Sequence, residues 1–202
     1  MRTQQMEGKT AAGDTQAVIK FYRLKERFPS AVLREARAIS SGRIDVASRL
    51  DLRKKYIFTC DPQSARDYDD ALSFETDLKG NRILGVHIAD VSHFVRRHSA
   101  IDEEAYRRGN SVYFCDRVLP MLPEELSNGV CSLVPGEDRL TFSVFMTFDR
   151  SGKMVKRRFA KSVIRSKARF TYEEVMGVIS GRNNAIDKRF QRVIRDVTSL
   201  AM

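Results

Sequence analysis

The sequence has no apolar run that approaches the roughly 20 residues needed to span a bilayer. Its polar first stretch, MRTQQMEGKTAAGDTQ, lacks the apolar core of a secretory signal. Only three cysteines are present, and they are widely spaced and form no CxxC pair. A disulfide framework and a cysteine zinc site are therefore both disfavoured. Together these absences predict a cytoplasmic protein with reduced thiols and no membrane association.

Charge is abundant and unevenly distributed, with a net charge of +10 over 202 residues. Residues 1–60 hold 13 Lys and Arg against 6 Asp and Glu, and residues 151–202 hold 13 against 4, whereas residues 61–150 hold 10 against 16. Basic surface attracts a polyanion through counterion release. An acidic centre fits such a protein when divalent cations bridge its carboxylates to phosphate. A basic surface that only maintains solubility remains an alternative.

Short apolar segments separated by turn residues run along the chain. We expect strands over residues 56–60, 71–76, 82–91, 111–114, 140–148 and 153–164. Helices are expected over 31–39, over 100–108 between the cap residues Ser99 and Gly109, from Thr171 to near Gly181, and over 186–200. These elements predict an α+β fold in which helices pack on a largely antiparallel, twisted sheet.

The segment DPQSARDYDDA, residues 61–71, places Asp61, Asp67, Asp69 and Asp70 directly after a predicted strand. Four carboxylates this close repel one another, and a hard cation relieves the repulsion. Oxygen ligands at this density suit Mg²⁺ or Mn²⁺, which lower the pKa of an attacking water in phosphodiester hydrolysis. An exposed acidic turn is the plainer alternative. A calcium loop is disfavoured because the alternation, central glycine and terminal glutamate of an EF-hand are missing.

A second metal pattern, H-x-x-D-x-x-H, is formed by His87, Asp90 and His93. On a single strand, the two histidines would share one face while Asp90 would point to the other. This pattern therefore disfavours a histidine-based zinc site.

Four segments resemble, in order and spacing, the signature of the catalytic domain of the ribonuclease II/ribonuclease R family. They are FTCDPQSARDYDDALS (58–73), GVHIADVSHFV (85–95), RRGNSVYF (107–114) and VLPMLPEELSNGVCSL (118–133). The resemblance covers roughly residues 43–180. It implies a monomeric 3′→5′ exoribonuclease of the exoribonuclease II type, which hydrolyses single-stranded RNA to 5′-nucleoside monophosphates. Mg²⁺, or alternatively Mn²⁺, would be the cofactor, with no organic cofactor.

The resemblance also assigns roles to individual residues. Asp61 and Asp70 would be direct metal ligands, Asp67 would support them, and Asp69 would be indispensable for cleavage. All four are thus candidate metal ligands, and Asp67 and Asp69 are the catalytic candidates. Tyr113 would stack on the 3′-terminal nucleotide, a contact that tolerates any base. Without the resemblance, Tyr113 is more simply a half-buried strand tyrosine.

We expect three segments: a disordered stretch over 1–16, the tail and linker of a preceding barrel domain over 17–42, and the N-terminal portion of the catalytic domain over 43–202. The domain would be truncated at its C-terminus, so we expect this chain to lack groups that position RNA for turnover. A catalytically inactive RNA-binding fragment with the same fold is the main alternative. A structural module without an RNA-related role is a further one.

Overall fold

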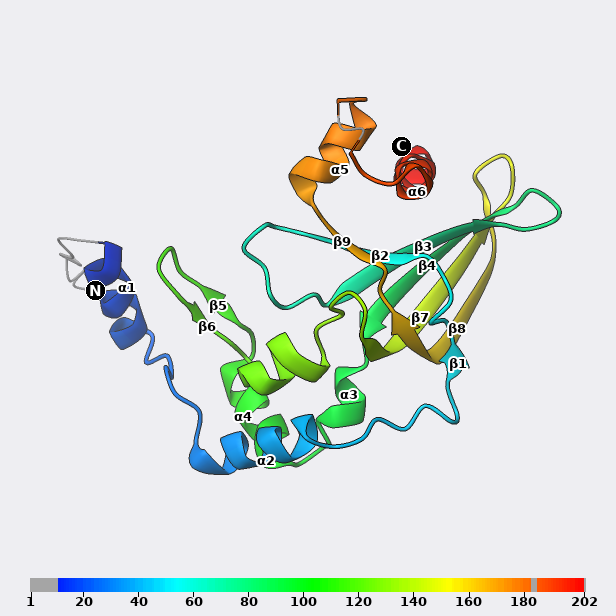
Figure 1. Ribbon diagram of the computed structural model, residues 1–202. Coiled ribbons are helices and arrows are strands. Elements are labelled where there is room, and N and C mark those ends of the chain that lie inside the picture. Colours follow the sequence, from blue (N-terminus) through cyan, green and yellow to red (C-terminus); the bar gives the residue numbers. More distant parts are fainter. Residues whose placement is uncertain (1–10, 183–184, 202) are drawn as a thin grey trace. The chain divides into compact units, whose positions relative to one another are not determined.

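The computed structural model describes residues 11–182 and 185–201 (Figure 1). They form two compact units. The helical unit combines residues up to Gly42 with Ser92–Ser127, and the sheet unit combines Arg43–Val91 with the residues from Asn128 onward. Among the described residues, no helix is long and apolar enough to cross a membrane.

The sheet unit is built on seven strands in the order β1-β8-β7-β4-β3-β2-β9. Their bounds are β1 Leu50–Asp51, β2 Ile57–Asp61, β3 Asp70–Thr76, β4 Arg82–Ala89, β7 Asp138–Phe148, β8 Met154–Arg165 and β9 Ala168–Thr171. The central pairings are antiparallel, whereas the edge strands β1 and β9 run parallel to β8 and β2. The predicted α+β fold with a largely antiparallel sheet is confirmed.

Helices α5 (Tyr172–Ile179) and α6 (Lys188–Ala201) cover one face of this sheet near β2, β3 and β9 (Figure 1). The core between them is apolar and rich in phenylalanine: Phe58, Phe74, Phe170, Val178, Phe190, Val193 and Ile194. The rings of Phe58, Phe170 and Phe190 contact one another edge-on or tilted, with centroids 5.2–6.1 Å apart. Burial of these large side chains fixes the two helices on the sheet.

The opposite face of the sheet carries a buried polar seam. Side chains alternate along a strand, so Ser73 points away from the phenylalanine core that contains its neighbour Phe74. The Ser73 hydroxyl lies 3.0 Å from His87 Nε2, and His87 Nδ1 lies 2.6 Å from the Ser143 hydroxyl. Ser143 in turn bonds the Ser162 hydroxyl. His87 is fully buried, and this burial lowers its pKa to about 4.

The helical unit contains α1 (Ala11–Phe21), α2 (Ser30–Ser40), α4 (Ala100–Arg108) and the hairpin of β5 (Val112–Tyr113) and β6 (Val118–Leu119). The short helix α3 (Val91–Phe94) and the π-helical turn η1 (Glu125–Val130) lie where the chain passes between the units. Buried Glu104 accepts a hydrogen bond from Arg108 Nε at 3.1 Å. Arg108 also donates to the carbonyls of Lys25 and Arg27, so it ties α4 to the preceding chain.

Local capping signals predicted the ends of two helices correctly. The Ser99 hydroxyl accepts a hydrogen bond from the Asp102 amide at 3.3 Å. Gly109, with a φ of 77°, caps the C-terminal end of α4. Thr171 and Glu174 form the predicted capping box of α5.

The expected division of the chain into three segments stays a prediction. Of the segment expected to be disordered, residues 1–10 lie outside the described residues, whereas residues 11–16 belong to helix α1. The helical unit joins residues up to Gly42 with Ser92–Ser127, so the two units are not the expected segments, and the expected domain boundaries stay a prediction. The assignment of residues 17–42 to a preceding barrel domain stays a prediction.

Candidate functional site

The pairing of β2 with β3 brings the acidic residues together. β2 ends at Asp61, and β3 begins at Asp70. The two strands are antiparallel neighbours, with Ile57 opposite Ser73. The end of one and the start of the other therefore meet at the same edge of the sheet. The connecting residues 62–69, called here the acidic loop, carry Asp67 and Asp69 back to this edge.

The acidic loop is fastened to the sheet unit by hydrogen bonds. The Ser132 hydroxyl donates to the Arg66 carbonyl at 2.8 Å and accepts from the Tyr68 amide at 3.1 Å. The Leu133 amide donates to the Tyr68 carbonyl, and the Ala89 amide to the Asp69 carbonyl, both at 2.9 Å. The backbone around Asp69 is thus held on two sides.

Arg169 reaches the start of the same loop from the edge strand β9. Parallel pairing places Arg169 opposite Thr59, two residues before Asp61. Its Nη2 donates to the carbonyls of Pro62 and Gln63 at 2.7 and 3.0 Å. Nothing in the sequence around Arg169 indicates this contact, because only the β2–β9 pairing brings the residue to the loop.

The carboxylates differ in exposure and share an unfavourable electrostatic environment. Asp61 is buried, with 7% of its surface exposed, whereas Asp69 and Asp70 are exposed and Asp67 is intermediate. Lost hydration, together with the charges of Asp70 and Asp67, raises the pKa of Asp61, whereas the neighbouring Thr59 hydroxyl and the charge of Arg169 oppose this shift. Lost hydration and the charges of the other three aspartates also raise the pKa of Asp69. The four predicted residues are therefore electrostatically coupled.

One observation indicates that these aspartates suit a bound cation. The Asp61 Oδ2 atom is buried and has no hydrogen-bond partner. Such an orphaned carboxylate oxygen is costly unless a cation or a proton satisfies it. In their present positions, however, no three His, Cys, Asp or Glu side chains of the described residues are grouped closely enough to hold a metal ion.

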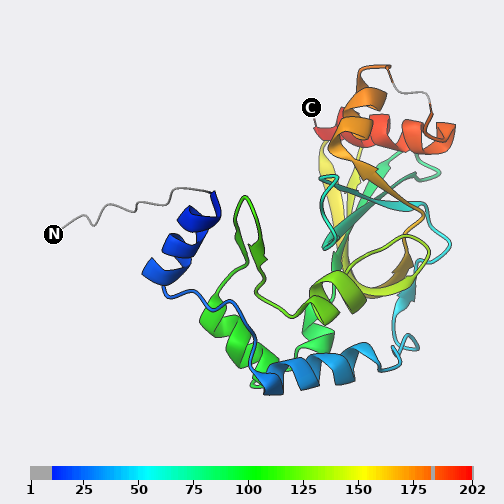
Figure 2. The ribbon, with the colours of Figure 1, turned by 60° about the vertical axis from the view of Figure 1, so that its left-hand side comes forward.

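Tyr113 belongs to the helical unit, on strand β5. The β5–β6 hairpin extends away from α4 (Figure 2), and 66% of the Tyr113 surface is exposed. Tyr113 is thus more exposed than the half-buried strand tyrosine of the plainer alternative.

The H-x-x-D-x-x-H pattern does not lie on one strand, because β4 ends at Ala89 and His93 lies in α3. His87 is bonded to Ser73 and Ser143 in the polar seam. Asp90 forms a buried ion pair with Arg49 at 2.6 Å. Both His87 and Asp90 therefore have structural roles.

None of the three cysteines forms a disulfide. Burial, and then the charge of Asp61, raises the pKa of Cys60 to about 11. Burial likewise raises the pKa of Cys131 to about 12. Both thiols stay protonated at neutral pH, which disfavours a nucleophilic role.

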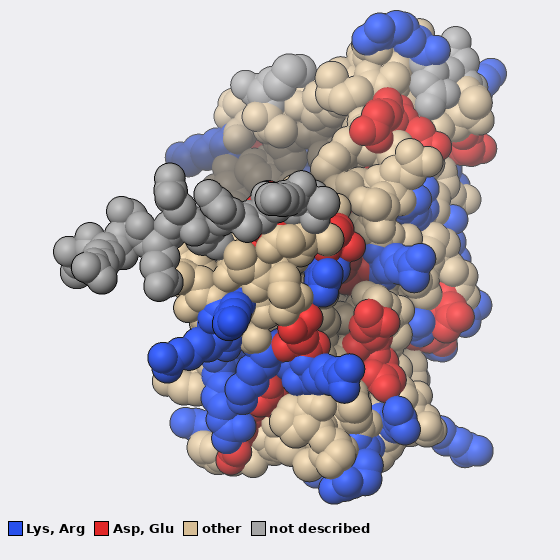
Figure 3. Space-filling model, turned by 90° about the vertical axis from the view of Figure 1, so that its left-hand side faces the viewer, with Lys and Arg blue, Asp and Glu red and all other residues tan. Residues whose placement is uncertain are grey.

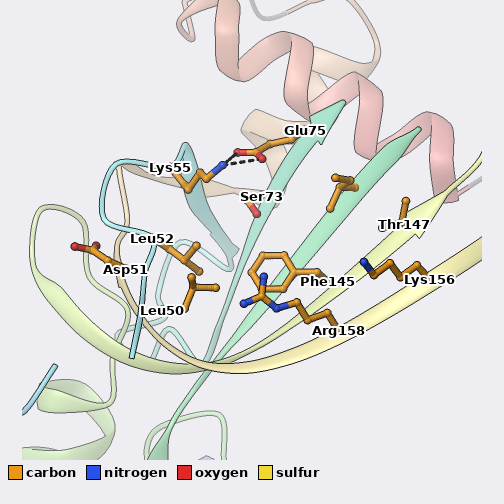
Figure 4. Close-up of a pocket in the computed structure, with 11 residues that line it drawn as sticks. Leu50, Asp51, Leu52, Lys55, Ser73, Glu75, Phe145, Thr147, Lys156 and Arg158 are labelled. Atoms are coloured by element: carbon orange, nitrogen blue, oxygen red, sulfur yellow. Dashed lines mark hydrogen bonds and ion pairs between the residues drawn. The ribbon is translucent and has the colours of Figure 1, made fainter. Parts of the chain in front are cut away.

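A separate cavity of about 390 Å³ opens on the polar-seam face of the sheet (Figure 4). Phe145, Lys156 and Arg158 point into it, and Lys55 pairs with Glu75 across its rim at 2.6 Å. None of the four aspartates lines this cavity, so it is distinct from the carboxylate site.

Comparison with known proteins identifies the family. The family model described as "RNB domain" matches residues 49–202. The chain belongs to this family. It is 52% identical over 166 residues to Ribonuclease R of Thermotoga maritima, an alignment that covers 80% of this chain and 23% of that protein. This RNB chain thus spans about a quarter of the length of that relative. The resemblance inferred from the four motifs is confirmed.

Solved structures agree with this assignment. Mycoplasma genitalium RNase R in complex with ribose-methylated single-stranded RNA superposes with a TM-score of 0.87 at 29% identity, covering 96% of this chain and 30% of that one. Yeast Ssd1, described as a pseudonuclease, superposes with a TM-score of 0.67 at 22% identity, covering 76% of this chain and 18% of that one. The second likeness shows only the shared fold.

Proposed function

We propose that this chain carries the metal-binding carboxylates of a 3′→5′ exoribonuclease that acts on single-stranded RNA and releases 5′-nucleoside monophosphates. The observation that carries the proposal is the convergence of Asp61, Asp67, Asp69 and Asp70 at one edge of an RNB-domain sheet, where a buried oxygen of Asp61 has no partner. The RNA bound by the Mycoplasma genitalium relative supports the choice of substrate.

The proposed cofactor is Mg²⁺, with Mn²⁺ as a substitute, held by all four aspartates. When bound, such a cation lowers the pKa of a water and stabilises charge on phosphate oxygens. Buried Asp61 and the neighbouring Asp70 would supply direct ligands, with Asp67 in support. Asp69 is exposed, which supports its proposed role at the reacting phosphate.

Tyr113 is proposed to stack on the 3′-terminal base, and no organic cofactor is required. Basic residues would bind the RNA backbone as dispersed contacts. On the face shown in Figure 3, Lys and Arg side chains alternate with Asp and Glu and do not form one continuous basic surface. We further propose that the protein acts as a monomer in the cytoplasm.

A second candidate is RNA binding without cleavage. It is favoured by the observation that the carboxylates in the described part of the chain are not yet grouped as a metal site. The two functions differ in their dependence on Asp69, because binding to phosphates does not require this carboxylate.

Both functions are tested by giving the purified chain 5′-labelled single-stranded RNA and Mg²⁺, with EDTA and Asp69→Asn as controls. A descending ladder that disappears in both controls supports hydrolysis. Intact RNA, bound equally well by wild type and Asp69→Asn, supports the binding function. RNA affinity that is undetectable even at low salt contradicts both, because phosphate contacts make binding strongest there.

A further inference from the structure

The acidic loop is held at two points by side chains that are not acidic. Arg169 binds the carbonyls of Pro62 and Gln63, the first two residues after Asp61. Ser132, which is fully buried, binds the backbone on both sides of Asp67. The two contacts come from segments more than 60 positions away along the chain, so they set the path of the loop in the folded protein.

We propose that Arg169 and Ser132 are positioning residues, which hold the acidic loop so that its carboxylates can converge on one divalent cation. The proposal rests on the metal site of the proposed function and assigns two residues outside it. Hydrogen-bonded neighbours that orient metal ligands contribute about 10-fold to 100-fold in metal affinity.

Because Arg169 is positively charged, a positioning role and a purely electrostatic effect on cation binding can be told apart. A guanidinium near Asp61 repels a divalent cation through its positive charge. If charge were its only effect, removal of Arg169 would strengthen cation binding. If Arg169 positions the loop, its removal weakens cation binding, because the carbonyls of Pro62 and Gln63 lose their shared donor. The two roles thus predict opposite signs.

Ser132 acts without any charge. Its hydroxyl is donor to the Arg66 carbonyl and acceptor from the Tyr68 amide, so it bridges a loop segment of three residues. Ser132→Ala removes both bonds and little volume. Partly buried backbone groups left without partners then favour other loop conformations.

The test is Mn²⁺ affinity, measured on the full 202-residue chain by the electron paramagnetic resonance signal of free Mn²⁺. Binding lost in Asp61→Asn defines the site. Arg169→Gln and Ser132→Ala are expected to weaken this binding about 10-fold. Two matched controls, Lys167→Gln and Ser64→Ala, alter exposed residues nearby and are expected to leave it within about twofold.

Loop order is measured independently of metal by amide hydrogen exchange. Exchange at Tyr68 is expected to accelerate in Ser132→Ala while circular dichroism stays unchanged. If Arg169→Gln fails to fold, Arg169→Lys replaces it. That variant keeps the charge, but its side chain has no Nη2 atom at the position that donates to both carbonyls, and it is expected to bind Mn²⁺ less tightly than wild type.

The outcomes separate the two proposals. Wild type that binds no Mn²⁺ at this site overturns the metal site and this inference together. Wild type that binds Mn²⁺, with Arg169→Gln tighter or unchanged and Ser132→Ala unchanged, overturns the positioning role alone.

Discussion

Acidification is expected to destabilise the sheet unit through His87. This imidazole is fully buried between Ser73 and Ser143, and burial lowers its pKa from the ordinary 6.5 to about 4. The unfolded chain therefore binds a proton at a pH where the folded chain does not. The stability that His87 contributes is fully present above pH 6.5 and is lost as the pH falls toward 4.

The size of this loss of stability follows from the shift in the pKa of His87. Each pH unit between the two pKa values corresponds to about 1.4 kcal/mol, so the complete loss is roughly 3 kcal/mol. Integration between pH 7.5 and pH 5 gives a decrease of about 2 kcal/mol in the free energy of unfolding. Asp61 and Asp69, whose pKa values are raised, act in the opposite direction as they take up protons.

Comparison with a variant isolates the contribution of His87. Urea unfolding of wild type and His87→Gln would be followed by circular dichroism at several values between pH 7.5 and pH 5. Glutamine does not titrate, and its amide retains a hydrogen bond within the seam. The stability of wild type should fall by about 2 kcal/mol more than that of His87→Gln over this range. Equal pH dependence in the two proteins would refute the assignment of a buried neutral imidazole.

Two further predictions concern buried polar contacts. Arg108→Met should lower the free energy of unfolding by about 3 kcal/mol in urea titrations, because Glu104 loses its closest partner in the interior. The double variant with Glu104→Gln should recover part of this loss, because the bonds from Arg108 to the carbonyls of Lys25 and Arg27 stay broken. A double variant as unstable as Arg108→Met alone would contradict the explanation. Gly85→Ala should cost about 2 kcal/mol, because the new Cβ would clash with the Ser73 hydroxyl and lie 3.0 Å from His87 Nε2. A change below about 0.5 kcal/mol would show that the seam adapts easily.

Local sequence signals predicted much of the sheet and most helices. Residues 140–148 and 153–164 flank a short turn and so identify the paired strands β7 and β8, and Ser99 and Thr171 mark helix starts through their own hydroxyls. The short edge strands β1 and β9 were missed. Each is defined by parallel pairing with a strand remote in sequence, and four residues or fewer leave no readable period.

The residues of the candidate site also differ in whether the sequence alone could reveal them. The four aspartates are conspicuous because they are close in sequence, and the β2–β3 pairing then explains why they meet. Arg169 and Ser132 carry no such signal, because an isolated arginine on a strand and a serine in a loop are ordinary residues. Only the folded sheet shows that both contact the acidic loop.

The central claim is that these aspartates serve metal-dependent hydrolysis of RNA from its 3′ end. It is tested most directly in a chimera, in which the aligned part of this chain replaces the matching part of Thermotoga maritima Ribonuclease R, an alignment of 166 residues. The chimera would receive 5′-labelled single-stranded RNA with Mg²⁺. We predict a ladder that shortens stepwise and that EDTA or Asp69→Asn abolishes. A folded chimera that binds RNA but leaves it intact, or one that Asp69→Asn does not impair, would contradict the account.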